Sequence, residues 1–228
     1  MEATLSELLQ QRPAPIRGVT HLPGIEEVEN IRRCELLRQF HAQIGLRYAR
    51  CEFANFEQRT DAHVKAVATL QSACRRLTKT SGGILFVGPP GAGKDHLAAA
   101  AAGYAIRKHG LSVSWINGVE WYARQRDRIN GPGTEAAEVA KLVAPDVLLI
   151  SDPIPPDTAL TSYQAQMLYQ VVDRRYRNLK ATWATVNAKN KSDLASRLTG
   201  PIADRLNHDA AVIQCWWESY RTAARDDA

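Results

Sequence analysis

Several features that would place this chain among zinc-binding or secreted proteins are missing from its sequence. Only four cysteines occur among the 228 residues, at positions 34, 51, 74 and 215, and no two of them form a Cys-x-x-Cys pair. This spacing argues against a zinc knuckle, and scattered thiols are typical of a reducing compartment. The first eleven residues carry acidic side chains and no long apolar run, which does not fit a secretory signal.

Long apolar segments are also missing. The longest one, LAAAAAGYAI from Leu97, has about half the length that a membrane span needs. Hydrophobic residues make up 45% of the chain, which is enough for a core, and the net charge is +5. A mildly basic balance permits a nucleic-acid partner without requiring one. We therefore expect a soluble cytoplasmic protein with no membrane partner.

Short apolar runs alternate with helical patterns along most of the chain. The runs predict strands at residues 84–87, 111–116, 146–151, 181–186 and 211–215. The helical patterns lie at residues 24–45, 61–79, 94–109, 119–129, 134–143, 161–178 and 192–206, and residues 46–57 read as irregular. Such alternation is typical of an α/β fold in which helices cover both faces of a parallel sheet.

A glycine-rich segment, GPPGAGKDH, lies between the first predicted strand and its following helix. This is the setting of a phosphate-binding loop, in which backbone N–H groups and a helix N-terminus face the phosphates of a nucleotide. Lys94 would reach the β- and γ-phosphates of ATP. The predicted nucleotide-binding residues are Gly88, Pro89, Pro90, Gly91, Ala92, Gly93, Lys94, Asp95 and His96.

Asp95 occupies the position after the lysine, where the usual loop has a serine or threonine that binds Mg²⁺. A carboxylate is a good ligand for a hard cation, so one reading makes Asp95 a direct or water-mediated magnesium ligand. The other reading is that Asp95 only stabilises the N-terminus of its helix. Both readings stay open from the sequence.

A second carboxylate, Asp152, ends the apolar run VLLIS. In ATPases of this type such an aspartate holds Mg²⁺ and a glutamate that follows it polarises the attacking water. Here the next residue is Pro153, which cannot accept a proton. We therefore expect ATP hydrolysis to be weak unless another group, such as Asp157, replaces the missing base.

Six segments resemble, in the right order, the AAA+ helicase loaders of the DnaC type and the related IstB transposition ATPases. The resemblance covers about residues 46–221 and implies a P-loop AAA+ fold with a short helical N-terminal extension and little or no C-terminal lid. The segments are LRYARCEFANF, GKDHLAAA, YQVVDRRY, TWATVNAK, LTGPIADRL and WWESYR. The first of them resembles the stretch that runs past the adenine in the family.

The same resemblance implies catalytic roles for three further residues beside Lys94 and Asp152. Asn187 stands where the family has its sensor-1 residue, and Arg221 where it has the sensor-2 arginine. Arg205 matches the arginine finger, through which one subunit would reach the nucleotide of its neighbour. The family's finger segment usually has two arginines, and the first falls on Pro201 here. Arg205 could instead form a salt bridge with Asp204 or Asp209.

Single-stranded DNA is the nucleic-acid partner that the resemblance implies. The segment WYARQRDR lies where the family has its DNA-contacting helix, which makes Trp121, Tyr122, Arg124 and Arg128 candidates for stacking and phosphate contact. Tyr163 matches another aromatic residue there by spacing. The alternative is a solvated basic face with Trp121 in the core.

We expect two parts, an N-terminal helical extension (residues 1–45) that could grip the helicase and an ATP-binding domain (residues 46–228). The favoured function is a loader of a DnaB-type replicative helicase that binds ATP and Mg²⁺. One alternative is an IstB-like transposition helper that acts on duplex DNA. The other is an interaction module that binds ATP without hydrolysing it.

Overall fold

The computed structural model describes residues 24–80, 82–128, 135–155, 158–197 and 200–223. Of the predicted elements, the first 23 residues of the N-terminal extension and the alternative base Asp157 lie outside the described residues. The same holds for the side chain of Arg128.

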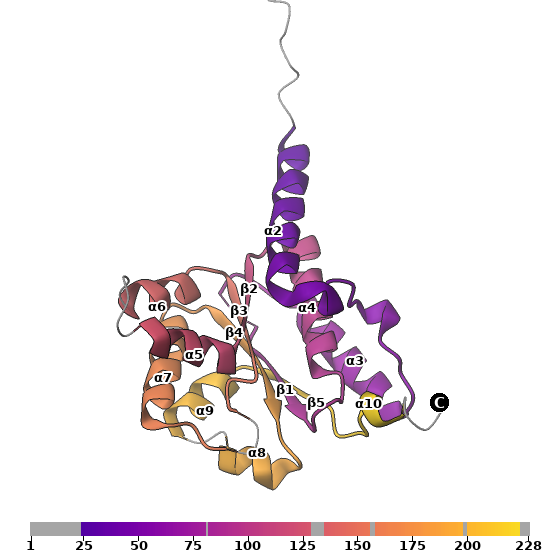
Figure 1. Ribbon diagram of the computed structural model, residues 1–228. Coiled ribbons are helices and arrows are strands. Elements are labelled where there is room, and N and C mark those ends of the chain that lie inside the picture. The colour runs from indigo at the N-terminus through magenta and orange to yellow at the C-terminus, as the bar shows by residue number, and fades with distance from the viewer. Residues whose placement is uncertain (1–23, 81, 129–134, 156–157, 198–199, 224–228) are drawn as a thin grey trace, which may run out of the picture.

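Five parallel strands form a single sheet in the order β2-β3-β4-β1-β5 (Figure 1). Their bounds are β1 Ile84–Gly88, β2 Val113–Asn117, β3 Val147–Ser151, β4 Ala181–Asn187 and β5 Ala211–Gln214. The order places β1 between β4 and β5, although β4 follows it by more than ninety residues in the chain. The parallel sheet that the sequence predicts is therefore confirmed.

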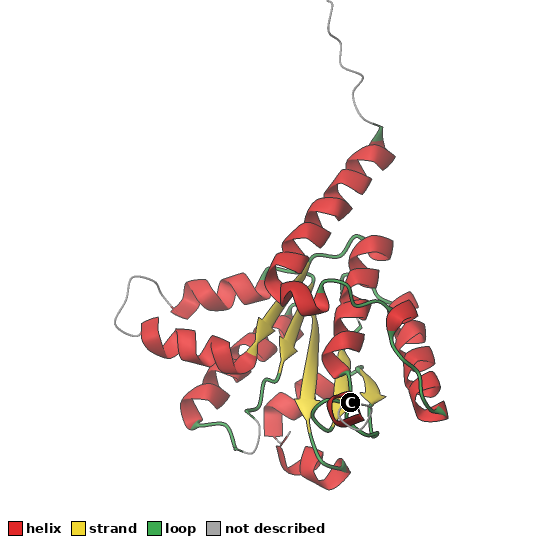
Figure 2. Cartoon of the chain, turned by 45° about the vertical axis from the view of Figure 1, so that its right-hand side comes forward, coloured by secondary structure: helices red, strands yellow, loops and turns green. Residues whose placement is uncertain are grey.

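Helices cover both faces of this sheet (Figures 1 and 2). One face is packed by α2 Ile25–Tyr48, α3 Asp61–Arg75 and α4 Lys94–His109. The other is packed by α5 Gly118–Arg128, α6 Glu135–Val143, α7 Ser162–Arg177 and α9 Gly200–Asn207. The remaining elements are a 3-10 turn at Phe53–Asn55, α8 Lys191–Arg197 and α10 Tyr220–Ala223. None of the helices in the described ranges is long and apolar enough to cross a membrane.

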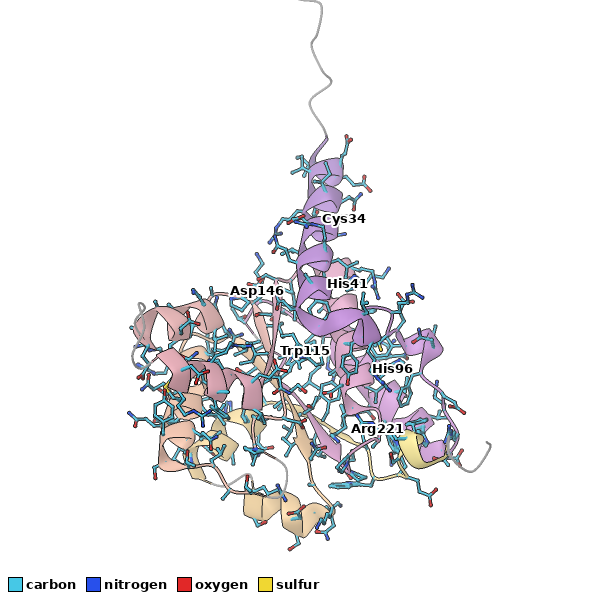
Figure 3. All side chains as sticks on the ribbon, viewed as in Figure 1. Cys34, His41, His96, Trp115, Asp146 and Arg221 are labelled. Atoms are coloured by element: carbon cyan, nitrogen blue, oxygen red, sulfur yellow. The ribbon has the colours of Figure 1, made fainter. Side chains whose placement is uncertain are left out.

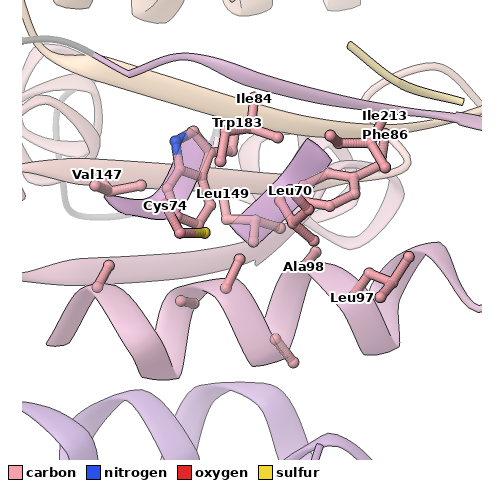
Figure 4. Close-up of a cluster of buried hydrophobic side chains, with 14 of the residues drawn as sticks. Leu70, Cys74, Ile84, Phe86, Leu97, Ala98, Val147, Leu149, Trp183 and Ile213 are labelled. Atoms are coloured by element: carbon pink, nitrogen blue, oxygen red, sulfur yellow. The ribbon is translucent and has the colours of Figure 1, made fainter. Parts of the chain in front are cut away.

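The core consists of two layers because successive residues of a buried strand point to opposite faces. In β1, Phe86 packs toward α3 and α4, whereas Leu85 packs toward α5 and α7. Figure 4 shows the first layer, where Trp183 and Leu149 lie over the alanine-rich face of α4. The small alanine side chains let this helix approach the sheet closely, so α4 is held firmly behind the loop that precedes it.

The helices differ from the predicted ones at their boundaries. The pattern at residues 192–206 reads as one helix, but the chain forms α8 and α9, because Gly200 has a φ of +65° and Pro201 follows it. The predicted break near Gly45 is a kink (φ 73°), after which helical structure continues to Tyr48. The short helix α10 was not predicted, and it is the only helix in the described part of the chain after β5.

Helix α2 has two dissimilar halves. Its first half rises clear of the body, as the position of Cys34 shows (Figure 3), and Ile25, Val28 and Ile31 are 89%, 51% and 60% exposed. Its second half buries Phe40 and Ile44 against the domain. There the Gln43 side chain accepts a hydrogen bond of 2.8 Å from the backbone N–H of Trp115 in β2.

Candidate nucleotide-binding site

The glycine-rich loop lies between β1 and α4 at the carboxyl edge of the sheet, where parallel α/β folds bind their ligands. Gly91 and Gly93 have φ values of +82° and +79°, which favour glycine. A Cβ atom on Gly91 would lie 2.0 Å from the Ser219 hydroxyl, and one on Gly93 would lie 2.8 Å from the Phe56 ring. A side chain at either position would therefore clash with a neighbouring segment.

Lys94 is almost fully buried at the start of α4. Its ammonium group donates to the carbonyl oxygens of Gly88 (3.0 Å) and Pro89 (2.8 Å) and to the Asn187 side-chain oxygen (2.8 Å). Burial lowers the pKa of Lys94, and the nearby Asp152 carboxylate opposes this shift. Phosphate oxygens of a ligand could replace these three acceptors around the ammonium group.

Asn187 joins Lys94 to Asp152. Its amide nitrogen donates to the Asp152 carboxylate at 2.6 Å, while its oxygen accepts from Lys94. Asp152 itself has a φ of +49°, a conformation that costs energy for a residue with a side chain and is often found at functional sites. Burial, followed by repulsion from Asp95, raises the pKa of Asp152 to about 6, against the attraction of Lys94.

Asp95 points toward the ends of β3 and β4. One carboxylate oxygen, Oδ1, accepts hydrogen bonds from the hydroxyls of Ser151 (3.1 Å) and Thr185 (2.9 Å). These two residues are direct partners in the register of β3 and β4, and both are buried. Neither Ser151 nor Thr185 is among the residues that the sequence predicts for the site. The available signal was their position, because each lies at a strand end within two residues of a predicted site residue.

Pro153, the residue after Asp152, has a tightly packed backbone. The carbonyl oxygen of Pro153 accepts a hydrogen bond of 2.8 Å from the buried Tyr122 hydroxyl. Gly118 lies so close behind the same backbone that a Cβ there would be 2.7 Å from the Pro153 Cα. No carboxylate takes the place of the missing glutamate at this residue.

A cavity of about 370 Å³ opens in front of the loop. Its size suits a small ligand, since such pockets usually measure about 300–1,000 Å³. Its walls come from the segment after α2, the loop, the two strand ends and α10. His96 and Arg221, labelled in Figure 3, both line it. The other lining residues include Arg47, Tyr48, Cys51, Asn55, Phe56, Glu57, Lys94, Asp95, Asp152, Asn187 and Tyr220.

The segment after β5 is fastened onto the glycine-rich loop. The Trp217 indole N–H donates to the Ala92 carbonyl at 2.9 Å, and the Tyr220 N–H donates to the Gly91 carbonyl at 3.1 Å. On the opposite side His96 lies 3.0 Å from the Asn55 side-chain oxygen and packs edge-on against Phe56. Segments from both ends of the domain thus enclose the space between the loop and Arg221.

Arg205 lies away from this cavity, on α9. Its guanidinium donates to Asp173 (2.9 Å), to the Pro201 carbonyl (3.0 Å) and to the Tyr169 hydroxyl (3.2 Å). It also stacks over the Tyr169 ring, with 4.9 Å between the guanidinium carbon and the ring centroid. A salt bridge is therefore present, and its partner is Asp173 rather than the expected Asp204 or Asp209.

The predicted DNA-contacting residues separate into two groups. Trp121 and Tyr122 are only 2% and 4% exposed, because they lie on the inner face of α5 and pack into the core. The prediction that their rings contact DNA is therefore corrected. An aromatic ring must be exposed to stack on a base, and in this fold the two rings fill the core instead. Arg124 is exposed on the same helix, 3.7 Å from Glu120. Tyr163 is partly buried at the start of α7.

A five-stranded parallel sheet with a glycine-rich loop after β1 and an aspartate after β3 defines a P-loop fold of the AAA+ class. The sequence model of the family described as "IstB-like ATP binding protein" matches residues 26–228. The match covers most of the chain, which therefore belongs to this family.

Two curated proteins that are similar to this chain have the same name. The replicative helicase loader DnaC of Escherichia coli (strain K12) is 26% identical over 199 residues, covering 86% of this chain and 79% of the relative. DnaC of Buchnera aphidicola subsp. Schizaphis graminum is 26% identical over 183 residues, covering 79% and 73%.

Solved structures give the same fold. The crystal structure of the DnaC helicase loader has a TM-score of 0.67 and 22% identity, covering 75% of this chain and 99% of that one. The replication initiator DnaA bound to AMPPCP and single-stranded DNA has a TM-score of 0.59 and 16% identity, covering 75% and 50%. These likenesses confirm the expected AAA+ architecture.

Proposed function

We propose that this protein is an accessory factor of DNA replication that binds ATP with Mg²⁺ and loads a replicative helicase of the DnaB type. The observation that carries the nucleotide part is the chain of contacts from Lys94 through Asn187 to Asp152, beside a cavity of about 370 Å³. The loader part is supported by two relatives that are named replicative helicase loaders. The similarity extends over most of the length of each relative.

The side chains at the cavity fit a nucleotide and its metal ion. Lys94 would exchange its present oxygen acceptors for phosphate oxygens, with Arg221 facing the same space. Carboxylate oxygens are the ligands that Mg²⁺ prefers, and Asp152 and Asp95 supply them here. Asn187 touches both Lys94 and Asp152, so it is placed to respond when either one moves. A bound Mg²⁺ would neutralise charge on the phosphates.

Hydrolysis of ATP is expected to be weak in this protein. A positioned general base contributes about 10²–10⁴-fold to such a reaction, and Pro153 cannot act as one. The backbone of Pro153 is held by Tyr122 and Gly118, so the residue is packed in place. ATP would then serve mainly as a ligand that favours assembly. Arg205, once released from Asp173, would be the residue of one subunit that reaches a neighbour's nucleotide.

Two surfaces are proposed to meet the partners. Single-stranded DNA would contact Arg124 and Arg128 of α5, with Tyr163 nearby in the same half of the domain. The helicase would contact the first half of α2, where Ile25, Val28 and Ile31 expose apolar side chains far from the body. Exposed apolar side chains grouped in this way mark interaction sites.

The first experiment measures ATP binding and turnover on the purified protein with Mg²⁺, with and without single-stranded DNA. Tight binding with negligible turnover is the expected result. Turnover stimulated by DNA would mean that another group replaces the missing base. Absence of binding in every condition would overturn the proposal.

A second experiment separates the loader from the transposition helper that the IstB-like family membership also supports. The protein is mixed with ATP, a DnaB-type helicase and either single-stranded or duplex DNA. A loader deposits the helicase on single strands, whereas a transposition helper clusters on duplex DNA without any effect on the helicase. The second result would favour the alternative function.

A further inference from the structure

We infer that Asp95, held in place by Ser151 and Thr185, makes nucleotide binding at this site depend on a divalent cation far more strongly than a serine or threonine at the same position would. This inference rests on the proposed binding of ATP. It adds two positioning residues and a specific dependence on metal that neither the family membership nor the motif assigns.

Two hydroxyl groups set the orientation of the Asp95 carboxylate. Its Oδ1 accepts hydrogen bonds from Ser151 (3.1 Å) and Thr185 (2.9 Å), which fixes the carboxylate over the ends of β3 and β4. Among the described residues, nothing donates a hydrogen bond to Oδ2. One oxygen is therefore engaged in positioning and the other is available to a ligand.

The residue types at this site differ from those of the usual loop, with a carboxylate on the loop and hydroxyl groups on the strands. A usual loop supplies a hydroxyl after its lysine, and here that residue supplies a carboxylate. The hydroxyls come instead from the strands, and both are buried, with Ser151 4% and Thr185 0% exposed. Ser151 directly precedes Asp152, so the arrangement brings Asp95 to the same strand end as the other acidic group.

Asp95 also changes the balance of charge in the cavity. The ionised side chains that line the cavity are three cations, Arg47, Lys94 and Arg221, and three anions, Glu57, Asp95 and Asp152. With a serine or threonine at residue 95 the same cavity would have one surplus positive charge for the phosphates. Here the lining is neutral overall, and a bare triphosphate meets two carboxylates close to Lys94. Asp95 and Asp152 would hold a divalent cation, and its charge would offset this repulsion.

The consequence is a large thermodynamic coupling between metal and nucleotide. It is measured as the ratio of the ATP dissociation constant in EDTA to that in Mg²⁺, using the full chain and a fluorescent ATP analogue. We expect Asp95→Asn and Asp95→Thr to lower this ratio by about tenfold or more, chiefly because binding in EDTA becomes tighter. Binding of Mn²⁺ with ATP, followed by electron paramagnetic resonance, should weaken in both variants.

The two hydroxyls are tested separately. Ser151→Ala and Thr185→Val should each lower the ratio by about two- to fivefold, because the carboxylate loses one of its two donors. Thr185→Ser keeps the hydroxyl and should keep the wild-type ratio. Ser114→Ala is the matched control, since it removes a strand hydroxyl that contacts Gln43 outside the site.

Each outcome has a separate meaning. An unchanged ratio in both Asp95 variants would overturn the inference and leave this residue as a helix-terminus charge only. If Thr185→Val fails to fold, Asp95→Asn and Ser151→Ala still decide the matter. If wild-type protein binds the analogue equally with and without Mg²⁺, the inference fails while nucleotide binding stands. If it binds under neither condition, the proposed function itself is wrong.

Discussion

The carboxyl edge of the sheet and the outer surface of α5 hold polar side chains in opposite ways. At the sheet edge Lys94 is 6% exposed and is bonded to Asn187, which is bonded in turn to Asp152. On α5 the side chain of Arg124 is 54% exposed and forms a loose ion pair with Glu120, with 3.7 Å between the charged atoms. Buried groups that share hydrogen bonds depend on one another, whereas exposed charges act nearly independently.

The two regions should therefore respond differently to substitution. A change at the sheet edge leaves buried partners unsatisfied, so its effect is large and extends to neighbouring residues. A change on the outer surface of α5 removes one charge and should have a small, separate effect. The inner surface of that helix, where Trp121 and Tyr122 lie, belongs with the core.

The largest effect is expected from Trp121→Ala. The ring is 2% exposed, and its removal from the core should lower the free energy of unfolding by about 3–5 kcal/mol. Urea denaturation measures this, with Arg124→Ala on the same helix as a control that stays near wild type. A loss of DNA affinity at unchanged stability would show instead that the ring contacts DNA.

The next largest effect is expected from Lys94→Ala. Removing the ammonium group should weaken ATP binding by about 100-fold, or about 2.7 kcal/mol, because a charged hydrogen-bond donor to the phosphates is lost. Calorimetric titration with ATP and Mg²⁺ measures it. Lys108→Ala, an exposed lysine of the same helix, is the matched control and should bind like wild type. An equal loss in both variants would argue against a specific role for Lys94.

Titration of the Asp152 carboxyl group should have an effect of intermediate size on the free energy of unfolding. Its folded-state pKa of about 6 lies above the usual value of 3.8, so the folded chain binds this proton more tightly than the unfolded chain. The contribution to stability is complete below about pH 4 and is lost as the pH rises through about 6. With allowance for solvent screening, the loss in nucleotide-free protein is about 1–2 kcal/mol.

Asp152→Asn tests this by removing the titrating group. The variant should be more stable than wild type at pH 7.5 without nucleotide and should lose the pH dependence between about 4 and 7. Denaturation at several pH values measures it, and Asp204→Asn changes an exposed carboxylate as the control. Equal pH profiles for wild type and Asp152→Asn would contradict the assignment.

The smallest effect is expected from Arg124→Ala. Loss of one exposed phosphate contact should weaken single-stranded DNA binding by less than about tenfold and lower the salt slope by about 1. Fluorescence anisotropy at several salt concentrations measures both. Arg126→Ala, on another face of the helix, is the control. If the two variants behave alike, DNA does not follow the Arg124 face.

The convergence of several candidate site residues could be predicted from the sequence because it follows from the geometry of parallel strands. Lys94, Asp152 and Asn187 each stand at the end of an apolar run or directly after the loop, and such ends meet at one edge of a sheet. Their convergence could be predicted without side-chain detail. The family resemblance then gave Arg221, which comes from a segment with no clear pattern of its own.

Side-chain direction and partner choice could not be predicted in the same way. The aromatic residues of α5 could face either DNA or the core, and only packing against the sheet decides between these. The pairing of Asp95 with Ser151 and Thr185 depends on strand register, which the local pattern does not reveal. Likewise, Arg205 bonds to Asp173 because α9 packs against α7, and the two residues are far apart in the chain.

The second half of α2 has a consequence for how copies of this protein can associate. Strand β2 forms one border of the sheet, and an uncovered border can add a strand from another molecule. The Gln43 side chain accepts a hydrogen bond from the outward-facing backbone N–H of Trp115, and α2 lies along the same strand. Growth of the sheet from one molecule into the next is therefore blocked at β2. Copies that associate at this border would have to join through helix surfaces, which can separate without breaking a backbone ladder.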